Sequence, residues 1–236
     1  MLLMDKSEDK QKERITYENE YDKHIADLKI KIIYKFLVDA KVLDVGCGET
    51  ETVYRRVGRV MKKYVGIDKD LEEIPKGDNF EYCINTLEDF KPSYKFDVVL
   101  LFGTIEEALD ENKHLSLARD FLKKGGNMFI SIPNPRALNR IMGVCNGFIK
   151  DPQSPDIHDI RQGHRRLLTI EQLAAACENN GLQVVDFWSV GFKPVPMSDM
   201  PLLKKYWHQF DNMMLQGKKY DINQFCAGWL LQATPK

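Results

Sequence analysis

Lys41-Val42-Leu43-Asp44-Val45-Gly46-Cys47-Gly48-Glu49-Thr50 is the stretch that decides the fold. We predict that an apolar strand runs here directly into a turn, with Asp44 two residues before the first glycine. The glycines at Gly46 and Gly48 permit backbone conformations closed to other residues and let a ligand lie against the main chain. Tyr64–Asp68 is a second apolar strand, and its final carboxylate lies 20 residues beyond Gly48. In a βαβ unit such a carboxylate reaches the ribose of a nucleoside, so the two segments predict an adenosine-type cofactor.

Length and composition fit one α/β domain spanning residues 1–236. The chain is 43% hydrophobic and has a formal net charge of −1, which favours neither nucleic acid nor an anionic membrane as a partner. No apolar run is long enough to span a bilayer. The five cysteines are scattered without the spacing of a zinc site, and Met1–Met4 is followed by charged residues rather than a secretory signal. We therefore expect a cytoplasmic protein with reduced thiols and no metal.

Apolar spacing predicts alternating helices and strands along the first part of the chain. A helical arm over residues 1–38 leads into the first strand, and the glycine turn is followed by a helix over Glu51–Met61. Such alternation is typical of a parallel sheet with helices on both faces. The remaining elements expected here are strands at Phe80–Ile84, Phe96–Phe102 and Asn127–Ile132, with a helix around Glu106–Leu122 that Gly125-Gly126 stops.

The last third of the chain has a different character. Residues 134–166 are rich in proline, glycine and polar residues, with one helical candidate at Ala137–Val144, and we interpret them as a lid over the binding site. Beyond the lid we predict a helix capped by Thr169 and ended by Gly181, a strand at Leu182–Val190, a helical stretch around Leu203–Leu215 and an antiparallel strand at Phe225–Ala233.

The glycine turn does not fit a dinucleotide. The dinucleotide fingerprint G-x-G-x-x-G places its third glycine beside the pyrophosphate. Here that position is Glu51, and a carboxylate at a helix start would repel the pyrophosphate. The residues therefore argue against NAD or FAD.

Several motifs resemble those of the class I S-adenosylmethionine-dependent methyltransferases. Val42–Gly48 resembles the first motif of this family, and Val65–Asp68 is similar to the second. Three later segments resemble family motifs in the right order: Phe96–Phe102, Leu122–Asn134 and Gly163–Thr169, the last of them as in the branch that acts on small molecules such as quinones and sugars. The resemblance covers about residues 17–190.

This resemblance implies a fold, a cofactor and a set of binding residues. The family fold is a Rossmann-like three-layer sandwich whose seven-stranded, mostly parallel sheet has the order 3-2-1-4-5-7-6 with an antiparallel last strand. S-adenosyl-L-methionine would be the cofactor, with Asp68 at its ribose and the glycine turn behind its methionine part. The cofactor-binding residues that the resemblance implies are Tyr21, Asp44, Gly46, Cys47, Gly48, Asp68, Lys69, Thr86, Leu87, Phe102 and Gly103.

The chain departs from the family pattern at two positions. Thr50 stands where the family often has a third glycine, and Glu107 replaces the histidine of the related pattern E-V-L-E-H. The candidates for acid or base catalysis are Glu107 and two histidines of the lid, His158 and His164, since imidazole titrates near neutral pH. The cluster Asp156-His158-Asp159 lacks the regular spacing of a metal site, and Arg161, Arg165 and Arg166 either recognise an anionic acceptor or form a solvated charged face.

The leading hypothesis is a methyltransferase that acts on an O or N atom of a small-molecule acceptor of the quinone, sugar or secondary-metabolite type. The alternatives are a catalytically silent scaffold protein with the same fold and a protein methyltransferase. The near-neutral charge speaks against an RNA acceptor. We expect a monomer or homodimer.

Overall fold

Seven strands form one sheet in the part of the chain that the computed structural model describes, residues 20–48, 53–70, 79–215 and 222–236. The strand order is β3-β2-β1-β4-β5-β7-β6, which confirms the predicted order. The strands are β1 (Lys41–Val45), β2 (Lys63–Asp68), β3 (Phe80–Ile84), β4 (Phe96–Phe102), β5 (Leu122–Pro133), β6 (Leu182–Val190) and β7 (Gly228–Pro235).

Only the last of these strands runs against the others. The pairs β1/β2, β1/β4, β2/β3 and β4/β5 are parallel, whereas β7 is antiparallel to both β5 and β6. The predicted antiparallel final strand is therefore confirmed. Because the other strands share one direction, their carboxyl ends meet at one edge of the sheet, where open α/β sheets bind ligands.

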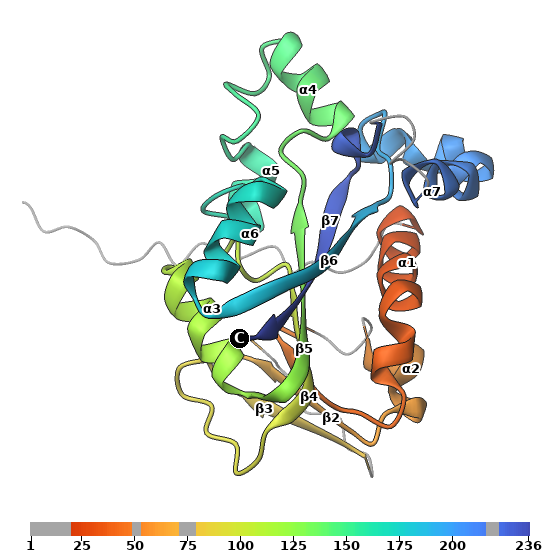
Figure 1. Ribbon diagram of the computed structural model, residues 1–236. Coiled ribbons are helices and arrows are strands. Elements are labelled where there is room, and N and C mark those ends of the chain that lie inside the picture. The colour runs from red at the N-terminus through yellow and green to blue at the C-terminus, as the bar shows by residue number, and fades with distance from the viewer. Residues whose placement is uncertain (1–19, 49–52, 71–78, 216–221) are drawn as a thin grey trace, which may run out of the picture.

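Helices cover both faces of the sheet (Figure 1). α3 (Glu111–Asp120) and α6 (Ile170–Asn179) lie on one face, and α1 (Glu20–Leu37) and α2 (Tyr54–Val57) lie on the other. α4 (Leu138–Cys145) projects beyond the carboxyl end of β5, and α5 (Ile157–Arg161) lies next to α6. The remaining helical segments are η1 (Gly58–Val60), η2 (Met197–Tyr206), α7 (Trp207–Leu215) and η4 (Ile222–Phe225).

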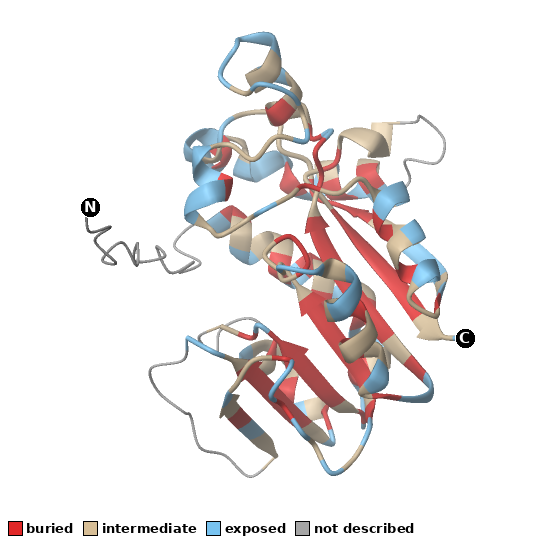
Figure 2. Cartoon of the chain, turned by 90° about the vertical axis from the view of Figure 1, so that its left-hand side faces the viewer, coloured by how far each residue is buried: buried red, intermediate tan, exposed pale blue. Residues whose placement is uncertain are grey.

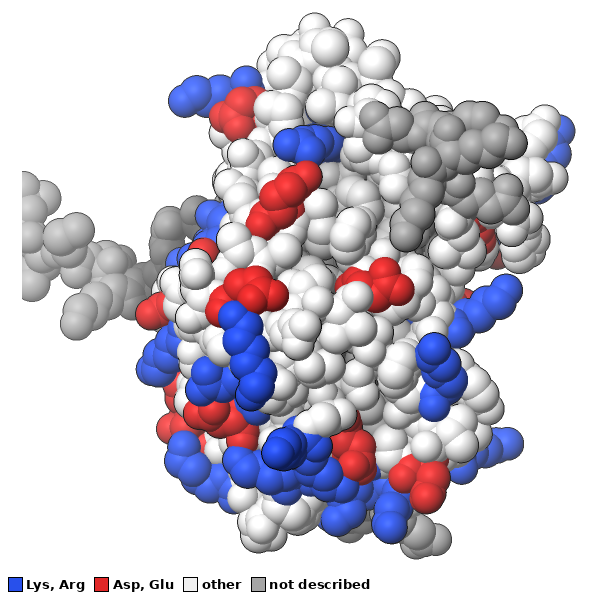
Figure 3. Space-filling model, viewed as in Figure 1, with Lys and Arg blue, Asp and Glu red and all other residues white. Residues whose placement is uncertain are grey.

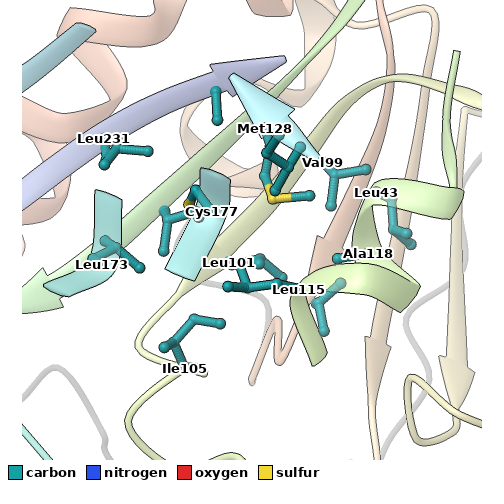
Figure 4. Close-up of a cluster of buried hydrophobic side chains, with 14 of the residues drawn as sticks. Leu43, Val99, Leu101, Ile105, Leu115, Ala118, Met128, Leu173, Cys177 and Leu231 are labelled. Carbon is teal, nitrogen blue, oxygen red and sulfur yellow. The ribbon is translucent and has the colours of Figure 1, made fainter. Parts of the chain in front are cut away.

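The central strands β1, β2, β4 and β7 are buried on both sides, as Figure 2 shows, whereas the edge strands β3 and β6 are partly exposed. Side chains alternate along a strand, so Val99 and Leu101 face α3 and α6, while Val98 and Leu100 face α1. Figure 4 shows the first of these layers, in which strand residues meet Leu115 of α3. Burial on both faces explains why the central strands appear in the sequence as nearly continuous apolar runs.

The helix predicted over Glu51–Met61 is much shorter in its described part. α2 is a single turn, Tyr54–Val57, and Gly58 begins the 3₁₀ segment η1. The Tyr54 ring lies over Gly58, where an added Cβ would approach it to 2.3 Å, and its hydroxyl donates to Asn79 at 2.8 Å. Glycine favours a helix poorly, and the close Tyr54 ring leaves no space for a side chain at this position.

The glycine pair Gly125-Gly126 does not stop a helix, because α3 already ends at Asp120. The pair lies inside β5, where the pairing with β4 shifts by several residues. Gly125 has φ +75°, and an added Cβ at Gly126 would lie 3.1 Å from the backbone oxygens of Asp97 and Lys123. The glycines therefore serve a β-bulge with close backbone approach.

Two other predicted boundaries also shift. The stretch around Leu203–Leu215 divides into η2 and α7, and Phe225 belongs to η4, so the final strand begins at Gly228. Thr169 caps α6 as predicted, in a capping box with Gln172.

Basic side chains gather at the lower end of the molecule in Figure 3, interleaved with acidic ones. This is the edge at which the parallel strands begin. A hollow of about 440 Å³ lies here, lined among others by Lys95, Arg119, Lys123, Lys124 and Lys236. It is at the opposite edge of the sheet from the glycine turn.

Within the described ranges, no helix has both the length and the hydropathy needed to cross a membrane.

Candidate active site

The glycine turn is fastened to the neighbouring strand. The backbone N–H groups of Gly46 and Cys47 both donate to the Ile67 carbonyl of β2, at 2.8 and 3.3 Å. Gly46 has φ +68°, and a Cβ added there would lie 2.5 Å from Cγ2 of Thr104, in the loop after β4. Gly48 also has a positive φ, +59°, but no described atom lies within 4 Å of a Cβ added there. A side chain at Gly46 would therefore clash with Thr104, whereas the described residues leave space for a ligand beside Gly48.

Asp68 connects the end of β2 to this turn. Its Oδ2 accepts a hydrogen bond from the Gly48 N–H at 3.0 Å, and its Oδ1 accepts one from the Asp70 N–H at 2.9 Å. The side chain is half-buried, and each carboxylate oxygen has room for a second donor. Asp68 can therefore hold the turn and receive a ribose diol at the same time. Lys69, the next residue, is exposed.

Asp44 is buried beneath the turn, with 2% of its surface exposed. The Tyr64 hydroxyl donates to its Oδ2 at 2.7 Å. The pKa of Asp44 is raised to about 7, mainly by burial and to a smaller extent by the charge of Asp68, while the Tyr64 hydrogen bond opposes the rise. The carboxyl group therefore titrates in the physiological range.

The segment after β3 lies beside the end of β2, because the Asn85 N–H donates to the Asp68 carbonyl at 3.2 Å. The Thr86 hydroxyl donates to Asp89 at 2.8 Å and accepts from the Asp89 N–H at 3.2 Å. The Leu87 side chain is in the core, so a ligand would meet the backbone at this position. The structure thus brings this segment, Asp68 and the glycine turn together at one edge of the sheet.

The other residues predicted to bind the cofactor lie in different surroundings. Phe102 ends β4 with the Lys29 ammonium 5.4 Å from its ring centre, and Gly103 follows with φ +76°. The Cys47 thiol points away from the turn into the core, where a Cβ on Gly66 would lie 2.8 Å from its Sγ. Tyr21 packs against Trp207 with ring centroids 5.1 Å apart, and its hydroxyl donates to the Phe192 carbonyl at 2.8 Å.

A buried acid, Glu106, lies in the loop after β4, directly before Glu107, the residue that the sequence predicts for catalysis. Glu106 is 3% exposed, and burial raises its pKa to about 7, with the charge of His164 opposing the rise. Its Oε1 lies 4.0 Å from Nε2 of His164. Glu107 is less buried, and its carbonyl accepts a hydrogen bond from Nε of Arg165 at 3.1 Å.

His164 and His158, both predicted for catalysis, differ in their surroundings. Nδ1 of His164 lies 3.3 Å from Oδ1 of Asp159, and the other carboxylate oxygen, Oδ2, accepts a hydrogen bond from Arg140 at 2.8 Å. Burial lowers the pKa of His164, but the Asp159 hydrogen bond and the Glu106 charge outweigh it, so the net shift is upward. His158 lies on the exposed face of α5, 2.9 Å from the Gln162 amide.

The acidic cluster around His158 has a local structural explanation. Asp156 and Asp159 form a capping box at the start of α5. Nowhere in the described ranges are three or more His, Cys, Asp or Glu side chains gathered as ligands for a metal ion.

The arginines that follow bind the loop after β4. Arg165 reaches the Glu107 carbonyl, and Arg166 donates to the Ala108 carbonyl at 2.6 Å and pairs with Glu111 at 3.0 Å. These contacts connect the segment 134–166 to the loop after β4, and both alternatives for the arginines, an anionic acceptor or a solvated charged face, stay predictions.

The charged groups around Glu106 and His164 form a cluster that sequence reasoning did not predict. Its missed members are Lys29, Glu106, Arg140 and Asp159. The loop after β4 is irregular, so no periodicity indicates which of two adjacent glutamates points inward. The other three come from elements far apart in the sequence.

The fold and this edge together define an α/β protein of the Rossmann-like class with a nucleoside-cofactor site. Residues 17–186 match the model of a family described as a methyltransferase domain. Since the match covers most of the chain, the protein belongs to this family, the class I S-adenosylmethionine-dependent methyltransferases, and S-adenosylmethionine is its cofactor.

Individual relatives are distant. The chain is 24% identical over 201 residues to the human protein named ubiquinone biosynthesis O-methyltransferase, mitochondrial, a match covering 80% of this chain and 51% of that protein. It is 32% identical over 104 residues to a tRNA U34 carboxymethyltransferase of Mannheimia succiniciproducens, covering 40% and 32%. These matches span about half or less of the relatives' own length.

Solved structures share the fold. The Burkholderia thailandensis 1,6-didemethyltoxoflavin-N1-methyltransferase, solved with its acceptor and S-adenosylhomocysteine, superposes with a TM-score of 0.60 at 15% identity, covering 92% of this chain and 80% of that one.

Proposed function

We propose that this protein transfers a methyl group from S-adenosylmethionine to a hydroxyl oxygen of a small molecule of the phenol or quinol type. The observation that carries the proposal is the buried acid–base cluster of Glu106 and His164 at the carboxyl end of β4. A hydroxyl must lose its proton to become a good nucleophile, whereas a neutral amine already has a free electron pair. A buried group that titrates near neutrality is suited to the first acceptor.

The cofactor would occupy the edge formed by the ends of β1, β2 and β4. We infer that Asp68 binds the ribose hydroxyls, the backbone of Gly46–Gly48 supports the methionine part and Asp44 receives the ammonium group. Asn85 to Leu87 would lie at the adenine, and Phe102 with Gly103 beside the methyl group. The open space above Gly48 and the spare acceptor capacity of Asp68 support this placement.

Three other predicted cofactor contacts remain predictions. The Tyr21 and Cys47 side chains are buried in the core, so each would need to contribute through its backbone or a rearranged side chain, whereas the exposed Lys69 side chain is accessible to a ligand. Thr50 and Glu51 lie outside the described residues.

The bound cofactor supplies a methyl group already activated by its sulfonium. The protein mainly has to align the acceptor with this methyl group and exclude water. We propose that residues 134–166, with α4 and α5, form the predicted lid and that residues 191–201 complete the acceptor wall. Contacts from Arg140 to α5 and from Arg166 to the loop after β4 support a lid held against the sheet.

Calorimetry and product analysis test the proposed function. We expect S-adenosylhomocysteine to bind the purified protein, and catechol with S-adenosylmethionine to give a methoxyphenol detectable by mass spectrometry, while o-phenylenediamine is methylated far more slowly. Cofactor binding without turnover of any phenol or catechol would favour the scaffold alternative. Transfer of labelled methyl to protein or tRNA instead would overturn the small-molecule assignment.

Cofactor affinity is expected to rise with pH between 6 and 8. The ammonium group favours the ionised form of Asp44, whose pKa is about 7 without cofactor, so protonation at low pH opposes binding. The limiting slope is tenfold per pH unit. The groups facing Asp44 are Asp68, Tyr64, Tyr82 and Cys47, and burial raises the pKa values of the two tyrosines and of Cys47 well above this range. Calorimetric titration of S-adenosylhomocysteine at several pH values measures the effect.

Tyr64→Phe is the matched variant. It removes the hydrogen bond that lowers the pKa of Asp44, so the rise in affinity should move to higher pH. Equal affinity from pH 6 to 8 in the unmodified protein would show that Asp44 does not face the ammonium group.

A further inference from the structure

One oxygen of the Glu106 carboxylate has no hydrogen-bond partner in the part of the chain that the structure describes. The side chain is 3% exposed, and among the described residues Oε2 makes no hydrogen bond although it is fully enclosed. Oε1 lies 3.9 Å from the position that a Cβ on Gly103 would occupy, which places the carboxylate at the carboxyl end of β4. The Thr104 hydroxyl, in the same loop, is also buried and has no partner among the residues described, while its methyl group lies against Gly46 of the cofactor turn. Buried polar atoms are rarely left unpaired, so these two indicate a ligand.

His164 lies next to Glu106 but is less suited to accept a proton. Its Nδ1 interacts with Asp159, and its Nε2 faces Oε1 of Glu106 at 4.0 Å. Burial raises the pKa of Asp159, but the hydrogen bonds from His164 and the Asp156 N–H and the charge of Arg140 outweigh it and lower the pKa to about 2, so Asp159 remains ionised. Both neighbours of the imidazole are carboxylates, which favours the imidazolium form, and a protonated imidazole has no free electron pair.

Charged groups from other elements also surround this pair. On α1, Lys29 interacts electrostatically with Glu106 and Asp22, and its ammonium lies 5.4 Å from the Phe102 ring centre. Glu107 follows Glu106 in the loop. Arg140 comes from α4, Asp156 caps α5, and Lys193 follows β6. Lys193 interacts electrostatically with Asp22, Asp156 and Asp159. Lys29 and the His164 imidazolium both favour the ionised form of Glu106 against the effect of its burial.

We propose that Glu106 is the base of the methyl transfer, taking the proton of the acceptor hydroxyl through Oε2, and that the Arg140–Asp159–His164 chain positions it. This assignment rests on the proposed function. The acceptor oxygen forms a bond to the methyl carbon as its O–H bond breaks and the proton passes to Glu106. The carbon–sulfur bond breaks with its electron pair remaining on sulfur, so the sulfonium becomes a neutral thioether and the carboxylate becomes a neutral acid. Charge and atoms balance without a further reactant.

The test compares two acceptors in Glu106→Gln. Catechol must lose a proton during the reaction, whereas 4-nitrocatechol is already largely ionised at pH 8. We expect kcat on catechol to fall by about 10²- to 10³-fold, the range of general base catalysis, and kcat on 4-nitrocatechol to fall by less than about tenfold. Binding of S-adenosylhomocysteine and the melting temperature show whether the variant folds, and Glu106→Asp should recover part of the catechol activity. Glu178→Gln is the matched control, because the Glu178 carboxylate pairs with Lys236 at the opposite edge of the sheet.

A pH profile tests the positioning chain. In the unmodified protein, kcat/KM on catechol should fall as pH drops through the pKa of Glu106. His164→Asn removes a positive charge beside Glu106, so this acidic limb should move to higher pH. A merely structural role for His164 would lower the rate without moving the limb.

Each outcome decides one point. Equal losses on both acceptors in a folded Glu106→Gln protein, or a larger selective loss in Glu107→Gln, would overturn the assignment of Glu106 and leave the proposed function intact. Failure of the unmodified protein to methylate either acceptor while it binds S-adenosylhomocysteine would overturn the proposed function and this inference with it.

Discussion

Asp68→Ala is expected to weaken binding of S-adenosylhomocysteine by at least about 10²-fold. A hydrogen bond to a charged group contributes about 1.5–3 kcal/mol, and the variant would lose two such bonds to the ribose. It would also release the Gly48 N–H, which donates to Oδ2 at 3.0 Å, and so loosen the turn that supports the methionine part. Isothermal titration calorimetry measures the affinity directly.

Asp68→Asn is the matched comparison, because the amide keeps one acceptor oxygen and the same shape. Its loss should be intermediate between those of the unmodified protein and the alanine variant. If the alanine variant bound S-adenosylhomocysteine within about threefold of the unmodified protein, less than the contribution of one charged hydrogen bond, the ribose would not lie at Asp68.

Arg140→Leu is expected to release residues 151–164 from the body of the protein. Arg140 is 8% exposed, and its guanidinium binds Asp159 at 2.8 Å and the carbonyls of Pro152 and Ser154. Removing one partner of a buried ion pair costs about 3–5 kcal/mol because the other charge stays buried and unpaired. Hydrogen exchange followed by mass spectrometry should show rapid exchange in this segment while the central strands remain protected.

Arg136→Leu provides the control on the same side of the molecule. Arg136 pairs with Glu171 at 3.3 Å, but both side chains are more than half exposed, and such pairs contribute at most about 1 kcal/mol. Unchanged exchange in residues 151–164 of the Arg140 variant would show that the guanidinium is not their anchor.

The sheet could be predicted almost completely from the sequence. The boundaries of β3, β4 and β6 coincide with the predicted strands. β4 is buried on both faces and is a continuous apolar run, whereas the edge strands β3 and β6 are recognisable by their β-branched and aromatic residues. The glycine turn and Asp68 could be paired in advance because both end adjacent parallel strands, and their hydrogen bond at 3.0 Å confirms that they meet.

The failures have a common physical origin in tertiary contacts. Glycine is found at helix ends and at bulges alike, and only the carbonyl of Asp97 close to Gly126 distinguishes the two uses. Glu106 and Glu107 differ in burial because the loop after β4 turns one of them inward. The loop has no regular repeat, so the sequence does not indicate which of the two is buried. Arg140 owes its role to partners 12 to 19 residues away across a loop, which no local pattern records.

The contacts of Arg140 also bear on how this protein could change its acceptor during evolution. Two of its partners are backbone carbonyls, at Pro152 and Ser154, and a carbonyl is present whatever side chain the residue carries. Provided that Asp156 and Asp159 keep the cap of α5, the side chains between these points can be exchanged without removing the anchor. Such a loop keeps its shape while its chemistry varies, so new acceptors can be explored by substitution here while the cofactor edge stays unchanged.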